Sequence, residues 1–119
     1  MAKYLNIEEE INGDVCVLSL DGELDMQAST ELQQRLQKLL DGGCKKIVAD
    51  MKKLRFISTA AVAVLIQMTR KARDLGGGLK LAGMTGQVRD TFRILHLDSG
   101  DETISISPSV EEALKEFKG

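Results

Sequence analysis

The fold is decided between residues 45 and 75, where the sequence reads KKIVADMKKLRFISTAAVAVLIQMTRKARDL. Residues 47–49 form a short apolar run, which is typical of a buried strand. From Ala61 onward the apolar residues repeat at helical spacing, so the chain changes from strand to helix within this segment. Ser58 and Thr59 stand at the change, where a hydroxyl residue usually begins a helix. The segment therefore predicts a buried strand followed by a helix.

Outward from this segment, strand and helix patterns alternate along the chain. Asn12-Gly13-Asp14 has the chemistry of a hairpin turn between two opening strands. Ser109, with Glu112 three positions later, forms a capping box before the last helix. The expected strands are residues 4–11, 15–20, 46–49, 79–82 and 103–106. The expected helices are residues 28–40, 59–75, 86–95 and 110–117, and residues 50–57 are expected to be a charged connection.

This order of elements predicts the fold class. A hairpin followed by alternating helix and strand favours a mixed sheet with helices packed on it. A chain of 119 residues suits one domain. We therefore expect an α/β fold in a single domain over residues 1–119, with its core at about residues 4–117. The sheet should have four to five strands, with about four helices packed on it.

Composition and charge narrow the kinds of partner. The 43% hydrophobic and 29% charged residues are ordinary for a soluble globular protein. The net charge of -2 leaves no basic stripe, so nucleic acid is not an expected partner. No apolar run approaches the roughly 20 residues of a membrane helix, and the polar start is no signal peptide. We therefore expect a cytoplasmic protein with no membrane partner.

The two cysteines support the same expectation. Cys16 and Cys44 have no Cys-x-x-Cys partner and no second metal-ligating group beside them. We interpret them as reduced thiols of a cytosolic protein, Cys16 in a strand and Cys44 in a loop.

The residues available for catalysis are few. His96 is the single histidine, and we interpret it as a capping or surface side chain because a general base needs a partnered site. No phosphate-binding loop and no Gly-x-Gly-x-x-Gly motif is present, and the glycines at 76–78 follow a helix instead of preceding one. Asp50 follows a strand without a metal-ligating companion, so it is interpreted as a loop acid near Lys52 or Lys53. We expect no enzyme, cofactor or metal.

Two motifs allow both a structural and a regulatory interpretation. In Gly22-Glu23-Leu24-Asp25, Asp25 could cap the following helix and Gly22 could allow a tight exit from the sheet. Either Ser58 or Thr59 could be an N-cap, which typically stabilises a helix by about 1 kcal/mol. The same helix start also tolerates a phosphate, because it carries partial positive charge and unpaired N–H groups.

At these motifs the chain resembles a STAS domain, and specifically the bacterial anti-sigma factor antagonists. The resemblance covers nearly the whole chain, and the order and intervals of its pieces make it specific for the fold. These pieces are Gly22-Glu23-Leu24-Asp25, Ile47-Val48-Ala49-Asp50, Leu54-Arg55-Phe56-Ile57-Ser58-Thr59, the glycines at 76–78, and Ser109-Val110-Glu111-Glu112-Ala113-Leu114.

The resemblance implies a function and a set of site residues. In this family the unphosphorylated antagonist binds an anti-sigma factor, often a serine kinase of the histidine-kinase-like ATPase type, which then releases its sigma factor. Phosphorylation at the start of the second helix ends the binding, and a phosphatase is a further candidate partner. The implied partner-binding residues, whose side chains we expect to be exposed, are Gly22, Glu23, Leu24, Asp25, Ser58, Ala60, Ala61 and Val62.

One departure from the family pattern concerns the phosphorylation site. The pattern reads Asp-Ser-Ser/Thr-Gly, and alignment through Phe56-Ile57 places Ser58 at the Asp and Thr59 at the phosphoacceptor. Ala60 then stands at the next hydroxyl and Ala61 at the glycine. The resemblance thus assigns phosphorylation to Thr59, with Ser58 as the alternative. A second hypothesis is a STAS scaffold or ABC-transporter-associated binding module without phosphate control.

Overall fold

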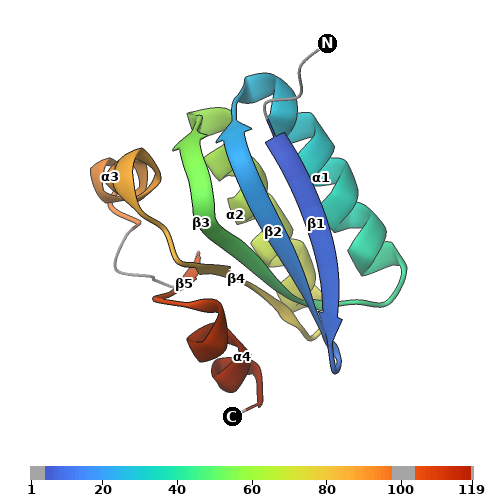
Figure 1. Ribbon diagram of the computed structural model, residues 1–119. Helices are drawn as coiled ribbons and strands as arrows, with labels where there is room; N and C mark the ends of the chain where they lie inside the picture. Colours follow the sequence, from blue (N-terminus) through green and yellow to red (C-terminus); the bar gives the residue numbers. More distant parts are fainter. Residues whose placement is uncertain (1–4, 98–103, 119) are drawn as a thin grey trace.

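The computed structural model describes residues 5–97 and 104–118, which form five strands and four helices (Figure 1). The strands are β1 (Leu5–Asn12), β2 (Val15–Leu24), β3 (Lys46–Ile57), β4 (Gly78–Ala82) and β5 (Ser105–Ser107). The helices are α1 (Met26–Asp41), α2 (Thr59–Asp74), α3 (Gly86–Ile94) and α4 (Val110–Lys118). The expected first strand began at Tyr4 and the expected last strand at Thr103, and both of these residues lie outside the described ranges.

The strands form one mixed sheet in the order β1-β2-β3-β4-β5. Only β1 and β2 pair antiparallel, through the predicted hairpin, and β2 to β5 pair as parallel neighbours. Helices α1 and α2 cover one face of the sheet, and α4 lies on the other side (Figure 1). The predicted α/β fold with a mixed sheet is therefore confirmed. No helix among the described residues combines the length and apolar character needed to span a membrane.

The main core lies between the sheet and the helices α1 and α2. Leu32 and Leu36 of α1 and Leu65 of α2 are fully buried there against the inward residues of the strands. A smaller apolar cluster lies under α4, where Ala113 packs with Val17 and other strand residues. The helical spacing of apolar residues thus determines which side of each helix meets the sheet.

Two strands are longer than the sequence predicted. β2 continues through Gly22 to Leu24, and β3 continues through the expected charged connection to Ile57. Their pairing runs to the end, with Leu24 opposite Ile57, and irregularities in register fall on either side of Gly22. Gly22 has a φ of 123°, a conformation that a side chain would disfavour, so it accommodates the irregularity. The connection prediction for residues 50–57 was wrong because an irregular strand does not show strict alternation.

The turn after α2 holds the chain tightly against the start of β3. Gly78 N–H donates to Lys45 O at 2.8 Å, and Gly77 N–H donates to Ala72 O at 2.9 Å, which closes the helix. A Cβ on Gly77 would stand only 2.0 Å from the Lys45 carbonyl oxygen, so the approach requires glycine. The glycines at 76–78 form the predicted chain reversal.

The two cysteines are not free thiols, contrary to the expectation. The structure joins Cys16 of β2 to Cys44 in a disulfide, with a Cα–Cα distance of 6.6 Å. Helix α1 ends with Gly43 N–H donating to Leu40 O and Cys44 N–H donating to Leu39 O, and this turn brings Cys44 toward the sheet. Because the pairing depends on how α1 packs against β2, the spacing of the cysteines did not indicate it.

We expect removal of this disulfide to lower the free energy of unfolding by about 3 kcal/mol, since it closes a loop of 28 residues in the unfolded chain. Urea denaturation with and without a reducing agent measures the effect. Cys44→Ser is the matched control, because its stability should be low and insensitive to the reductant. Equal stability of the wild-type protein under both conditions would contradict the disulfide.

Candidate functional site

The ends of β2 and β3 and the starts of α1 and α2 meet at one edge of the fold. Ser58 N–H donates to Leu24 O at 2.9 Å and joins the two motifs that the sequence singled out. Asp25 Oδ1 accepts from Ala28 N–H at 2.7 Å, which confirms it as the N-cap of α1. Ser58 Oγ accepts from Ala61 N–H at 3.2 Å, so Ser58 is the N-cap of α2.

Thr59 and the cap residue Ser58 differ in how exposed they are. Thr59 is the first residue of α2 and is exposed, whereas Ser58 is half-buried. The Thr59 hydroxyl makes no hydrogen bond within residues 5–97 and 104–118. The partial positive charge at the start of α2 favours an anion beside it. Thr59 is thus the accessible hydroxyl of this helix start.

Several residues expected on the surface are buried instead. Leu24, Ala61 and Val62 belong to the main core, and Val62 is only 2% exposed. Gly22 is also buried within β2. The physical reason lies in the periodicity of α2, because Ala61 and Val62 share the face that packs on the sheet with Leu65. The expectation that these four residues are exposed was wrong.

The accessible part of the predicted set is smaller. These residues are partly exposed around the junction: Glu23, Asp25, Ser58 and Ala60. The structure brings them together because β2 and β3 end side by side, and α1 and α2 begin there.

Two apolar side chains beside the junction were missed by the sequence analysis. Met26, next to the cap Asp25, is 73% exposed, and Phe56, which pairs with Glu23 across β2 and β3, is 39% exposed. Met26 is the first residue of α1 and lies three positions before the buried Ser29, so its exposure comes from its place at the start of the helix, and that place is the signal that could have found it. Phe56 gave no such signal, because its segment was assigned to a connection.

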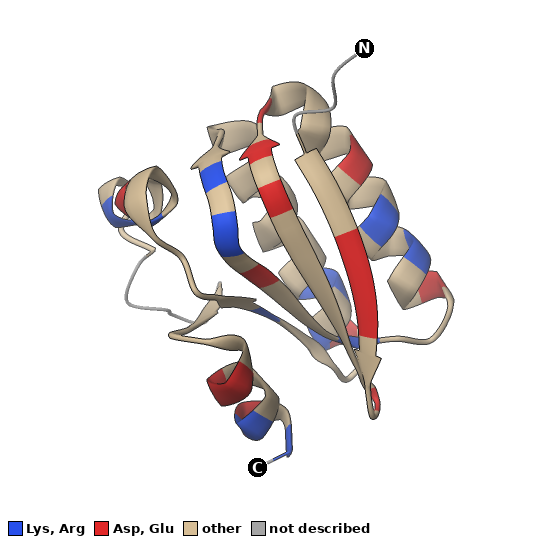
Figure 2. Ribbon diagram, viewed as in Figure 1, with Lys and Arg blue, Asp and Glu red and all other residues tan. Residues whose placement is uncertain are grey.

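Charges of both signs lie along the strands that lead to the junction. Figure 2 shows acidic residues along β1 and near the end of β2, with basic residues on β3 beside them. Arg55 Nη1 and Asp21 Oδ1 form an exposed pair at 3.6 Å. At the opposite end of β2, Lys46 donates to Asp14 at 3.0 Å and lowers the pKa of that carboxyl.

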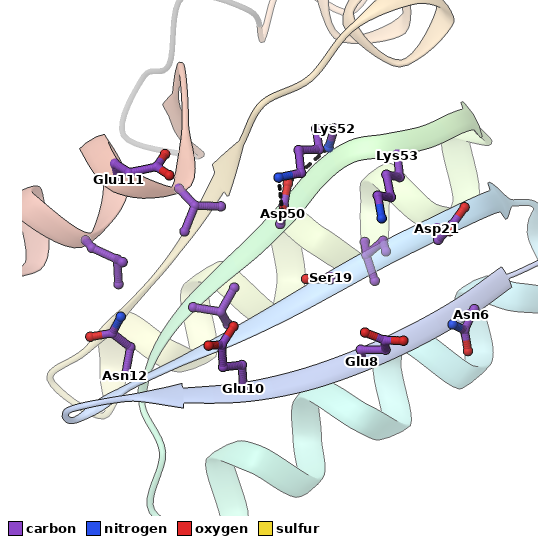
Figure 3. Close-up of a pocket in the computed structure, with 14 residues that line it drawn as sticks. Asn6, Glu8, Glu10, Asn12, Ser19, Asp21, Asp50, Lys52, Lys53 and Glu111 are labelled. Carbon is purple, nitrogen blue, oxygen red and sulfur yellow. Dashed lines mark hydrogen bonds and ion pairs between the residues drawn. The ribbon is translucent and has the colours of Figure 1, made fainter.

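A groove of about 300 Å³ lies between β1 and α4, on the side of the sheet away from α1 and α2 (Figure 3). Its lining includes Asp50, which is 8% exposed and lies within β3, so its assignment to a loop was wrong. Asp50 Oδ1 accepts from Lys52 N–H at 3.1 Å, and Oδ2 lies 3.9 Å from Lys52 Nζ. Neither Ser58 nor Thr59 lines this groove. The groove and the junction are therefore separate features.

Within the described ranges, no three His, Cys, Asp or Glu side chains lie close enough together to hold a metal ion. His96 is exposed just after the end of α3, with a φ of 59°. Of the two hydroxyl groups at the junction, that of Thr59 is the more exposed.

Comparison with known proteins agrees with this fold. The chain is 24% identical to the anti-sigma-F factor antagonist RsfB of Mycobacterium tuberculosis over 105 residues, which are 88% of this chain and 83% of RsfB. Its fold matches the crystal structure of an anti-sigma factor antagonist from Mycobacterium paratuberculosis with a TM-score of 0.84, at 20% identity, over 97% and 95% of the two chains.

The Bacillus cell fate determinant SpoIIAA has the same fold. Its phosphorylated form matches with a TM-score of 0.69 at 19% identity, over 93% of this chain and 98% of SpoIIAA. Its unphosphorylated form matches with a TM-score of 0.77 at 21% identity, over 97% and 96%. The family model described as "Mlab, STAS domain" matches residues 7–107, and the chain therefore belongs to the STAS domain family.

Proposed function

We propose that this protein is an anti-sigma factor antagonist, which binds its anti-sigma factor when unphosphorylated and releases it when Thr59 is phosphorylated. The observation that carries the proposal is the exposed hydroxyl of Thr59 at the start of α2, beside the joined ends of β2 and β3. The names of RsfB and of the structural neighbours support the same class of partner.

A phosphate at Thr59 would act on the partner more than on the fold. It adds roughly -1.5 to -2 charges at a helix end that favours negative charge, so the domain should stay folded. The bulk and charge of the phosphate would fall on a surface that includes Ala60 and Met26. A loss of about 3 kcal/mol in binding free energy already weakens affinity more than a hundredfold.

The geometry favours Thr59 over Ser58 as the acceptor. The Ser58 oxygen accepts a hydrogen bond from Ala61 N–H, and phosphorylation there would disturb the cap of α2. The Thr59 hydroxyl can be modified without loss of that bond. We propose a serine/threonine kinase of the histidine-kinase-like ATPase type as the partner, and a phosphatase as the enzyme that resets the site.

The test uses purified candidate anti-sigma factors of this ATPase class from the source organism. Incubation with ATP, followed by intact mass measurement and site mapping, should show one phosphate on Thr59. Isothermal titration calorimetry should then show binding by the unmodified protein and none by the phosphorylated one. Thr59→Val, which keeps the shape of the side chain, is the control and should bind without being modified.

One outcome would favour the second hypothesis. Binding without phosphate on Thr59 or Ser58 would identify a STAS module without phosphate control, such as an ABC-transporter-associated subunit. Failure of every candidate ATPase to bind would contradict the antagonist function itself.

We expect Met26→Ala to weaken partner binding roughly tenfold, because an exposed apolar side chain beside the junction can fill a pocket of the partner. Glu23→Lys should also weaken partner binding, because it reverses a charge on this surface. Both changes should alter the free energy of unfolding by less than about 0.5 kcal/mol. Leu75→Ala is the control, since Leu75 is also exposed but lies at the other end of α2. A Leu75→Ala effect as large as that of Met26→Ala would contradict the location of the surface.

A further inference from the structure

The last residues of β3 lack a neighbouring strand on one side. β4 pairs with β3 only from Lys46 to Asp50, although β3 continues to Ile57. Beyond Asp50 the edge of β3 that faces away from β2 therefore has no strand partner among the described residues. Helix α3 lies beside this end of β3 (Figure 1).

The side chain of Gln87, in the first turn of α3, takes the place of the missing strand. Ile57 N–H donates to Gln87 Oε1 at 2.9 Å, and Gln87 Nε2 donates to Ile57 O at 3.4 Å. One amide group thus pairs with both backbone groups of one residue, as a neighbouring strand would. Ile57 is two residues before Thr59.

Gln87 is itself held in place. Its Nε2 also donates to Thr91 Oγ1 at 2.8 Å, and Thr91 Oγ1 donates to Gln87 O at 2.9 Å. The helix that carries them is anchored by Val88 and Phe92, which are both fully buried in the main core. The amide of Gln87 is therefore presented to Ile57 by a fixed element.

The backbone before Thr59 is consequently bound from two directions. Gln87 holds Ile57 on the side of α3, and Leu24 O accepts from Ser58 N–H on the side of β2. We propose that Gln87 is a positioning residue, which fixes the end of β3 and thereby the direction in which Thr59 is presented to the partner. The role in presentation rests on the proposed function.

Loss of the amide should loosen this junction without unfolding the domain. Ile57 N–H and C=O would lose their hydrogen-bond partner on this side, while the Ile57 side chain stays packed in the main core. Thr59 would then be presented in several orientations, and the partner would have to order the junction on binding, which lowers affinity.

Three variants test the inference. Gln87→Met removes the amide and keeps the length of the side chain, and Gln87→Glu keeps only the oxygen that accepts from Ile57 N–H. Gln34→Met is the control, on the exposed side of α1. Amide hydrogen exchange followed by NMR measures protection at Ile57, Ser58 and Thr59 in the free protein. Calorimetry with the ATPase that binds the wild type measures affinity.

We expect Gln87→Met to speed amide exchange at Ile57 and to weaken binding, each by roughly tenfold. This is the order of magnitude expected for the loss of one or two hydrogen bonds. Gln87→Glu should retain protection of Ile57 N–H, and Gln34→Met should match the wild type. Faster exchange with unchanged affinity would reduce Gln87 to a structural role and overturn the inference, as would unchanged exchange. If no ATPase binds the wild type, the proposed function fails, and exchange at Ser58 and Thr59 alone decides whether Gln87 positions them.

Discussion

Thr59→Glu is expected to weaken binding to the anti-sigma partner by roughly 10- to 100-fold while the domain stays folded. The carboxylate supplies part of the charge of a phosphate, at a helix start that accommodates it. The loss therefore arises at the partner, which must desolvate a charge and approach a larger side chain. Calorimetry gives the affinity, and circular dichroism during thermal unfolding reports the stability of the same sample.

A variant at the preceding residue tests whether the position of the charge determines the loss of binding. Ser58→Asp adds the same charge one residue earlier but keeps an oxygen that can accept from Ala61 N–H as an N-cap. It should weaken binding much less than Thr59→Glu. Equal affinity of both variants and the wild type, together with no phosphate after exposure to the kinase, would remove phosphate control from the proposal.

Val62→Arg is expected to lower the free energy of unfolding by about 4 kcal/mol. Val62 is 2% exposed in the first turn of α2, and an arginine there would bury a charge without a partner or force the helix from the sheet. Urea denaturation followed by circular dichroism measures the change.

A matched control lies at the next residue. Ala63 is exposed on the outer side of α2, so Ala63→Arg should change the free energy of unfolding by less than about 0.5 kcal/mol. If the two arginine variants were equally stable, Val62 would lie outside the core, and its assignment to an exposed partner surface would be restored.

Features with local causes were predictable from the sequence. The caps Asp25, Ser58 and Ser109 act within one helical turn, and all three accept the hydrogen bonds expected of them. The hairpin turn and the glycines after α2 are local in the same way. The order of strands and helices, and hence the fold class, followed from these signals and from apolar periodicity.

Features that depend on distant partners were not predictable. The second half of β3 is a strand because β2 pairs with it up to Leu24, although its own residues alternate poorly. The Cys16–Cys44 disulfide likewise requires the packing of α1 on the sheet. Gln87 was not singled out, because only the folded chain brings α3 beside Ile57.

The candidate site contains features that were predictable from the sequence and features that were not. The resemblance assigned the phosphate to Thr59 with Ser58 as the alternative; this assignment stays a prediction, and the structure shows that Ser58 is the residue that caps α2. The burial of Ala61 and Val62 followed from the periodicity of α2 and could have been foreseen. The exposure of Phe56 could not, because it depends on the irregular pairing of β2 and β3.

Helix α2 is fastened at both ends, by Ser58 N–H on Leu24 O and by the close approach of Gly77 to Lys45 O. Sliding of this helix along the sheet would break both contacts, so we do not expect such a movement to relay a modification at its first residue. The regulatory signal would then be the number of chains that can bind the anti-sigma factor, and not a change in their conformation. Under the proposed function, the strength of the transcriptional response would follow the ratio of unmodified chains to anti-sigma factor molecules, and synthesis of new chains would raise that ratio.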